Sequence, residues 1–212
     1  MSALLTVENL TIHHQGKPLV QHVSFTAKAG ETLCLVGASG SGKTLTAQSI
    51  MGLLPTNMNV TADKLLFNKQ NLLNLSEPEW EDVRGAQIGM IFQEPLSSLN
   101  PVKSVGWQVA EVLQLHTKLS KKARHQQVIE LFKQVQLDNP EKRYDQYPHE
   151  LSGGQRQRVM IAMALAMKPK LLIADEPTTA LDVAVQGEIL RLIKSLQKEM
   201  GMAVLFITHD FG

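Results

Sequence analysis

The feature that most constrains the fold is a glycine-rich octapeptide, Gly37-Ala38-Ser39-Gly40-Ser41-Gly42-Lys43-Thr44. The apolar residues Thr32–Val36 before it predict a buried parallel strand, in which Cys34 would be a small core residue. The residues after it have helical spacing from Lys43 until Pro55. A strand that turns through such a loop into a helix is the phosphate-binding unit of α/β proteins. The octapeptide therefore predicts an α/β fold with a phosphate site.

Each residue type in this loop suits the binding of a nucleoside triphosphate. Glycines let successive N–H groups turn inward around an anion, and the helix N-terminus adds the positive end of its dipole. Lys43 is expected to reach the β- and γ-phosphates, and the Thr44 hydroxyl to ligate Mg²⁺. The predicted phosphate contacts are Gly37, Ser39, Gly40, Ser41, Gly42, Lys43 and Thr44. The alternative is a plain glycine-rich turn.

A second motif joins an apolar strand, Leu171–Ala174, to two acidic residues, Asp175 and Glu176. In an open α/β sheet, ligands bind at the carboxyl ends of the strands, so both acids would face that crevice. Asp175 is suited to hold Mg²⁺, and Glu176 to orient or deprotonate an attacking water. Two acids before Pro177 could instead merely open a turn. With the phosphate loop in the same chain, the catalytic interpretation is favoured.

The remaining pattern predicts where these motifs lie in the fold. Leu4–Leu10 and Val20–Ala27 alternate like strands of an antiparallel layer, and Ile88–Phe92 and Ala203–Ile207 are short apolar strands. From about residue 94 to 168 the periodicity is helical, with Ser120 as a cap. We therefore expect a parallel-sheet α/β core with an N-terminal antiparallel β layer and an inserted helical subdomain.

Composition excludes several other classes of protein. The 212 residues carry a formal net charge of +1, which gives no general attraction to nucleic acid. A single cysteine excludes an intrachain disulfide and a cysteine-based zinc site. The longest apolar run, Val159–Met167, is about half of the ~20 residues that a membrane span needs.

A third motif, Leu151-Ser152-Gly153-Gly154-Gln155, directly precedes a helix. Ser152 can cap that helix, and the two glycines expose backbone N–H groups at its N-terminus, which makes a second anion site. With the phosphate loop before it and LLIADEP after it, the chain resembles the ABC ATPases over its whole length. The stretches IFQEPLSSLNP, YPHELSGGQRQRVMIAMALA and LLIADEPTTALDV look like the ATPase subunits of bacterial dipeptide, oligopeptide, glutathione and nickel importers.

The resemblance implies roles for further residues. Gln93 would sense Mg²⁺ and water and link to the membrane subunits, Asp182 would be the D-loop aspartate, and His209 would contact the γ-phosphate. Gln93 could instead be a solvated loop residue, Asp182 a helix cap and His209 a surface histidine. The adenine-stacking position is occupied by His14 rather than the usual Tyr or Phe, and a polar hairpin tip is an equal alternative there.

The resemblance also implies cofactors and partners. These are ATP and Mg²⁺, a second ATPase domain in a head-to-tail homo- or heterodimer, integral membrane subunits and, indirectly, a substrate-binding protein, but no nucleic acid. Ser152, Gly153, Gly154, Gln155 and Asp182 would then meet the nucleotide of the second domain. We expect a peripheral protein on the cytoplasmic side of the inner membrane, with the peptide or related solute selected elsewhere.

Three functions other than transport are alternatives for this chain. ABC ATPases of translation or DNA repair usually carry tandem cassettes, coiled-coil insertions or zinc modules, which this sequence lacks. A regulatory module without turnover is opposed by the intact acidic residues, and a phosphate-loop kinase by LSGGQ. The chain ends at Gly212 just after a strand, so we expect residues 1–212 to be one ABC ATPase domain truncated at its C-terminus.

Overall fold

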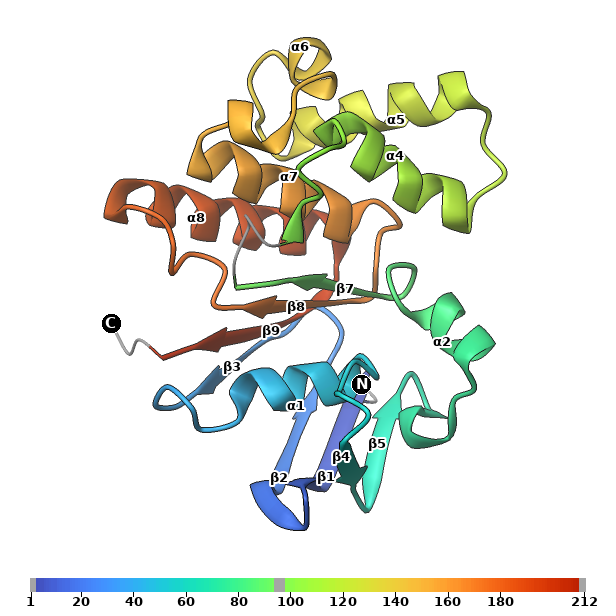
Figure 1. Ribbon diagram of the computed structural model, residues 1–212, viewed down its shortest axis with the longest axis vertical. Helices are drawn as coiled ribbons and strands as arrows, with labels where there is room; N and C mark the ends of the chain where they lie inside the picture. Colours follow the sequence, from blue (N-terminus) through green and yellow to red (C-terminus); the bar gives the residue numbers. More distant parts are fainter. Residues whose placement is uncertain (1–2, 94–97, 210–212) are drawn as a thin grey trace.

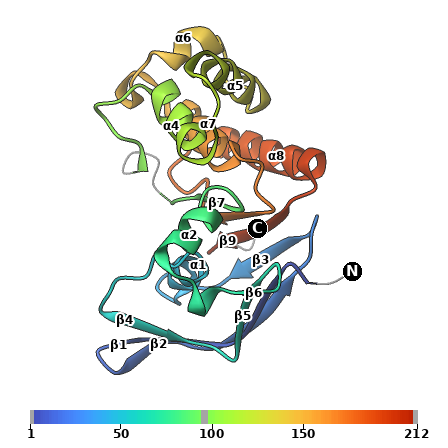
Figure 2. The same ribbon diagram turned by 90° about the vertical axis from the view of Figure 1, so that its right-hand side faces the viewer.

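The computed structural model describes residues 3–93 and 98–209. Within these residues the strands form two sheets, and the views in Figures 1 and 2 place a helical lobe on the far side of the second sheet from the first. The antiparallel sheet has the order β2-β1-β5-β6, with β4 also paired to β1, and the parallel sheet has the order β3-β9-β8-β7. The predicted two-sheet core with a helical insertion is therefore what the chain forms.

The antiparallel sheet is built around a long hairpin. Gln15 and Gly16 connect its two strands and both have positive φ, 50° and 76°, as a tight two-residue turn requires. The first strand extends to His14, further than the alternation of residues 4–10 indicated, because its pairing with β2 continues, through several register shifts, up to this turn. The strands are β1 (Leu5–His14), β2 (Lys17–Ala27), β4 (Met58–Thr61), β5 (Lys64–Phe67) and β6 (Gln70–Asn71).

The parallel sheet carries the two motifs at the carboxyl ends of its strands. Its members are β3 (Thr32–Val36), β7 (Ile88–Ile91), β8 (Leu171–Asp175) and β9 (Ala203–Thr208). The prediction of β3 as a buried strand with Cys34 in the core was wrong, because Thr32, Cys34 and Val36 are exposed. In the described part of the chain, β3 is one of the two edge strands of the parallel sheet and pairs only with β9. The side chains on one of its faces, Thr32, Cys34 and Val36, stay exposed.

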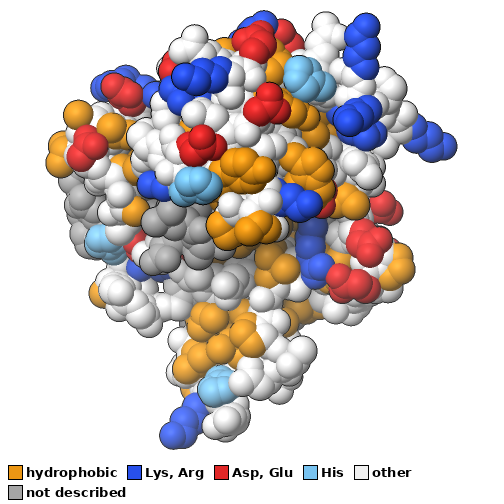
Figure 3. Space-filling model, turned by 45° about the horizontal axis from the view of Figure 1, so that its top comes forward, with side chains coloured by type: hydrophobic (Ala, Val, Ile, Leu, Met, Phe, Trp, Pro, Cys, Tyr) orange, Lys and Arg blue, Asp and Glu red, His pale blue; other side chains and the backbone are white. Residues whose placement is uncertain are grey.

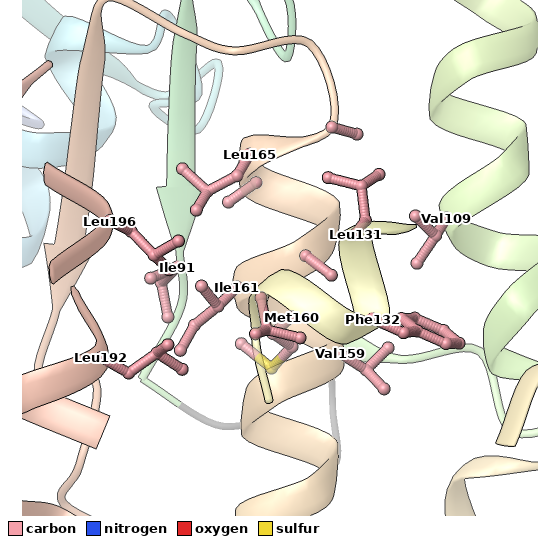
Figure 4. Packing of buried hydrophobic residues seen from close by; sticks show 14 of the residues in the cluster. Ile91, Val109, Leu131, Phe132, Val159, Met160, Ile161, Leu165, Leu192 and Leu196 are labelled. Carbon is pink, nitrogen blue, oxygen red and sulfur yellow. The ribbon is translucent and has the colours of Figure 1, made fainter. Parts of the chain in front are cut away.

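Strand β8 is buried on both faces of the parallel sheet. Leu172 and Ala174 belong to a hydrophobic cluster shared with the helices, whereas Leu171 and Ile173 belong to a second cluster shared with the antiparallel sheet. Figure 4 shows the first cluster, in which Ile91 of β7 lies among side chains of two helices. Because successive side chains of a strand point to opposite faces, the apolar residues Leu171–Ala174 of β8 join both cores.

The helical lobe lies between β7 and β8 in the sequence, where the insertion was predicted. Ser120 caps its second helix as expected, since its Oγ accepts the N–H of Ala123 at 3.2 Å. The inner face of that helix, which includes Val128 and Phe132, is buried. The elements are α4 (Val105–His116), α5 (Lys121–Gln134), α6 (Pro140–Tyr144), η2 (Pro148–Glu150) and α7 (Gly153–Leu165), followed after β8 by α8 (Val183–Met200).

Helix α1 (Lys43–Ile50) follows the phosphate loop and lies between the two sheets in Figure 1. It ends before Pro55, because Gly52 has a φ of 61° and starts a turn. The short elements η1 (Leu72–Asn74) and α2 (Glu77–Val83) complete this side. No helix in the described part of the chain is both long and apolar enough to cross a membrane.

Candidate nucleotide-binding site

The phosphate loop runs from the end of β3 into the first turn of α1. Gly42 is the N-cap of that helix, with a φ of 90°, and a Cβ there would lie 2.4 Å from Val20 Cγ2. Gly40 also has a positive φ, 78°. Left-handed backbone and close approach both require glycine. The glycines at positions 40 and 42 are therefore required by the shape of the loop.

Lys43 is the cation of the loop, and it is only 8% exposed. Its Nζ donates to the carbonyl oxygens of Gly37 at 2.7 Å and Ala38 at 2.8 Å. The ammonium group therefore lies along the inner edge of the loop. Phosphate oxygens brought into the loop would find this charge already in place.

A cleft of about 260 Å³ opens beside the loop. One wall consists of loop and helix residues, and the other of residues from the ends of β7 and β8. The lining residues are Ser39, Gly40, Gly42, Lys43, Thr44, Leu45, Gln93 and Glu176. Two motifs that are far apart in the sequence thus meet in one place, as predicted from the parallel topology.

Asp175 ends β8 and is 2% exposed. Burial raises the pKa of its carboxyl group, while a hydrogen bond with Thr44 opposes that increase. Its Oδ1 atom is buried without a hydrogen-bond partner. A buried carboxylate oxygen that no protein group satisfies is suited to a cation.

These oxygen atoms fit Mg²⁺. The Thr44 hydroxyl adjoins the carboxyl group of Asp175, and hard oxygen ligands of this kind are what Mg²⁺ prefers. Among the residues that the structure describes, no three His, Cys, Asp or Glu side chains gather as a metal site. Any Mg²⁺ here would therefore be held by these few oxygens together with phosphate, which is the usual arrangement for this cation.

Glu176 follows directly and has an unusual backbone, with a φ of 46°. Its N–H donates to Ile207 O of β9 at 2.9 Å, which holds that conformation. Its Oε2 accepts from Gln93 Nε2 and Thr179 Oγ1, each at 3.0 Å. Its Oε1 lies 3.0 Å from His209 Nδ1. One carboxylate therefore joins the ends of three strands.

Partial burial alone would raise the pKa of Glu176, yet the net shift is downward. Hydrogen bonds from His209 and Thr179 outweigh the burial, and the positive charge of Lys43 adds to them. Glu176 is consequently ionised at neutral pH. Gln93 and His209 both contact this carboxylate, but both are also exposed, as a solvated loop residue and a surface histidine would be, so their catalytic roles stay predictions.

The third motif, Leu151-Ser152-Gly153-Gly154-Gln155, is the signature segment; it lies at the N-terminus of α7, outside the lining of the cleft. Ser152 Oγ accepts the N–H of Gln155 at 3.2 Å, and Gln155 Oε1 accepts the N–H of Ser152 at 2.9 Å. This is a complete capping box. Asp182 caps α8 by accepting the N–H of Val185 at 3.1 Å, which was its structural alternative. Gly154 packs against that cap, since a Cβ there would lie 2.9 Å from Val185 Cγ1.

His14 lies at the tip of the β1–β2 hairpin rather than in the lining of the cleft. Its ring Nε2 is 3.0 Å from Asn57 Nδ2. The adenine contact assigned to it therefore stays a prediction, and the hairpin-tip alternative describes its contacts here. Thr179 was missed by sequence reasoning, although its place three residues after Glu176 offered a signal for a local hydrogen bond.

The comparisons agree with this geometry. A family model described as ABC transporter matches residues 20–179. The oligopeptide transport ATP-binding protein OppD of Bacillus subtilis is 54% identical over 91% of this chain and 54% of its own length. The dipeptide transport ATP-binding protein DppD of Escherichia coli is 48% identical over 99% of this chain and 65% of its own length.

A solved structure gives the same result for the fold. It is the dimeric post-hydrolysis state of the ATP-binding cassette MJ0796 bound to ADP and Pi, with a TM-score of 0.81 and 31% identity over 97% of this chain and 88% of that one. The chain spans 54% and 65% of the lengths of the two curated relatives. The resemblance and the fold predicted from the motifs are confirmed. The chain belongs to the ABC transporter family.

Proposed function

We propose that this chain binds and hydrolyses Mg-ATP to power a bacterial importer of peptides or a related small solute. The observation that carries the proposal is the carboxylate of Glu176, which lines the phosphate-loop cleft and is contacted by Gln93 and His209. The curated relatives named for oligopeptide and dipeptide transport support the choice of solute.

In this proposal the loop and the buried acid bind the nucleotide. The loop N–H groups and Lys43 hold the β- and γ-phosphates, and Thr44, Asp175 and the amide oxygen of Gln93 hold Mg²⁺. When bound, Mg²⁺ neutralises charge on the phosphates. The ATP contacts would be Gly37, Ser39, Gly40, Ser41 and Gly42 of the loop, with His14 toward the adenine.

Glu176 would act on the attacking water. An ionised carboxylate accepts a hydrogen bond from that water and turns its oxygen toward the γ-phosphate. Gln93, Thr179 and His209 fix the carboxylate in place through 3.0 Å contacts. Such positioning reduces the reorganisation needed at the moment of reaction. His209 would in turn face the γ-phosphate from the end of β9.

A second ATPase domain would complete the site. The first N–H groups of α7 have no partner within their helix, and with the helix dipole they favour an anion. Ser152, Gly153, Gly154 and Gln155 would close on the ATP of the second domain, with Asp182 nearby. The dimeric structure of the ABC relative supports the pairing of two such domains.

Membrane subunits would dock on the helical lobe and its surroundings. Val102 is 74% and Leu115 is 76% exposed, and Trp107 is 41% exposed. Figure 3 brings this lobe forward and shows hydrophobic side chains among charged groups of both signs. These apolar side chains are exposed and would be available for contact with a protein partner. The chain would then lie peripherally on the cytoplasmic side of the membrane, with a substrate-binding protein acting indirectly.

The Glu176→Gln variant tests the proposal. We expect it to bind Mg-ATP but to hydrolyse it at least ~10²-fold more slowly, because it lacks the general base. It should also accumulate as an ATP-bound dimer, because without hydrolysis the closed dimer does not open. Light scattering measures this dimer. Glu8→Gln, which removes an exposed ion pair with Lys64 in the antiparallel sheet, is the matched control. Unchanged turnover in Glu176→Gln would refute the assignment.

The role in transport needs a separate readout. Affinity capture from solubilised membranes should recover integral membrane subunits with the full polypeptide. Recovery of nucleic acid instead would favour an ABC ATPase of translation or repair.

A further inference from the structure

The side chain of Asp138, in the connection between α5 and α6, reaches the signature segment. Its Oδ1 accepts from Gln155 Nε2 at 3.0 Å, across 17 positions of sequence. No motif singles out Asp138, and neither the phosphate loop nor the acidic pair contacts it. The contact therefore connects the signature segment to a residue that the sequence motifs did not indicate.

Gln155 is held at both ends of its amide group. Its Oε1 accepts the N–H of Ser152, while its Nε2 donates to Asp138. An ionised carboxylate can only accept hydrogen bonds, so it selects the amide orientation that directs Nε2 toward it. That orientation leaves Oε1 facing the N–H of Ser152. The capping box at the start of α7 thus depends on Asp138, because Asp138 sets the orientation of the Gln155 amide.

Asp138 is itself fixed by a third group. Its Oδ2 accepts from Arg143 Nη2 at 2.7 Å, and the Arg143 side chain is only 15% exposed. This bond lowers the pKa of Asp138, with burial opposing it and Gln155 and Asn139 contributing further. On the other side, Arg158 Nη1 of α7 donates to Val135 O at 2.9 Å, which holds the same connection. The carboxylate therefore presents Oδ1 from a fixed position.

We propose that Asp138 is a positioning residue for the signature segment, acting through Gln155. By fixing the Gln155 amide it holds the capped N-terminus of α7 in the shape that directs the N–H groups of Gly153 and Gly154 toward the ATP of a second domain. The inference rests on the proposed function, because only that function gives the segment a phosphate to bind.

Two measurements on the full chain test the role. Amide hydrogen exchange at Ser152 should quicken about fivefold in Asp138→Ala, as expected for loss of a cap contact. In steady-state ATPase assays, kcat should fall about tenfold with little change in KM, because a misplaced group in the second domain's site affects turnover rather than the grip of the phosphate loop. Asp138→Asn, which keeps an acceptor oxygen, should recover part of both losses.

A double-mutant cycle separates this role from simple support of α6. If Asp138 acts through Gln155, the effect of Asp138→Ala on kcat should vanish in a Gln155→Ala background. Effects that add would overturn the inference. Glu130→Ala, which removes an exposed ion pair with Lys133 on α5, is the control and should change neither measurement.

The remaining outcomes distinguish the two proposals. Unchanged exchange at Ser152 in Asp138→Ala would overturn the positioning role, and so would faster exchange with unchanged kcat. A parent chain that binds ATP but neither hydrolyses it nor dimerises would overturn the proposed function itself. In that case faster exchange at Ser152 would still support the Asp138–Gln155 contact.

Discussion

Replacing Asp175 with asparagine should stabilise the protein in the absence of added nucleotide. The carboxyl group is 2% exposed and its Oδ1 has no partner, so its charge is held at a cost. An amide keeps the shape and the neighbouring Thr44 hydroxyl but removes the charge. We expect the free energy of unfolding to rise by about 1 kcal/mol, since an unsatisfied buried charge costs more than a neutral group. For a chain of this size that raises Tm by about 2–4 °C.

The increase in the free energy of unfolding caused by Asp175→Asn should become smaller as the pH falls. Burial raises the pKa of Asp175 in the folded protein above its ordinary value of 3.8. The unfavourable charge is therefore present above the folded pKa and is lost as the pH falls toward the unfolded value. The stabilisation by Asp175→Asn should be greatest above the folded pKa and should shrink as the pH falls toward 3.8.

Urea unfolding followed by circular dichroism at several pH values measures this directly. A second series with Mg-ATP should stabilise the parent much more than the variant, because Asp175 is a predicted Mg²⁺ ligand. Asp145→Asn, at an exposed position after α6, controls for loss of one negative charge. A variant that is less stable at every pH, or whose extra stability does not shrink as the pH falls toward 3.8, would refute the account of a costly buried charge.

Two further predictions concern the phosphate loop. Lys43→Ala should abolish ATP binding in a fluorescence titration, because the loop contains no other cation to neutralise the phosphates, and wild-type turnover in this variant would remove the assignment. Gly42→Ala should lower the free energy of unfolding by about 1–3 kcal/mol, because its φ of 90° disfavours a side chain and its Cβ would meet Val20 at 2.4 Å. Gly30→Ala, with a φ of 74° and open space around it, is the control in urea unfolding, and an equal loss there would contradict the role of the contact with Val20.

Much of the core follows from local sequence patterns. The strands of the parallel sheet are short apolar runs that stop at glycine or polar residues, so their positions could be predicted to within a residue or two. Helix α2, which follows β5 and β6, was not predicted. Its start could have been recognised from the sequence, because Ser76 and Glu79 form a capping box there. The exposure of Cys34 could not be foreseen, because it depends on what packs against that face of β3.

The contacts of the site depend on chain topology rather than on local pattern. Gln93 and Glu176 are 83 positions apart, and only the order of the strands brings the ends of β7 and β8 together. The motifs named both residues, but not the hydrogen bond between them. The contact of Asp138 with Gln155 is a more demanding case, because it joins a connection without a motif to the signature segment. A sequence pattern can point to two contacting residues only when at least one of them belongs to a known motif.

The double burial of β8 determines which parts of the cleft can move. A strand whose alternate side chains belong to two separate cores cannot slide or tilt without disturbing both. Asp175 and Glu176 at its end are therefore the stationary members of the site. Gln93 follows the strand β7 at one border of the sheet, and His209 is half exposed beyond β9. Any rearrangement during a catalytic cycle must accordingly move Gln93 and His209 toward Asp175 and Glu176, which stay in place.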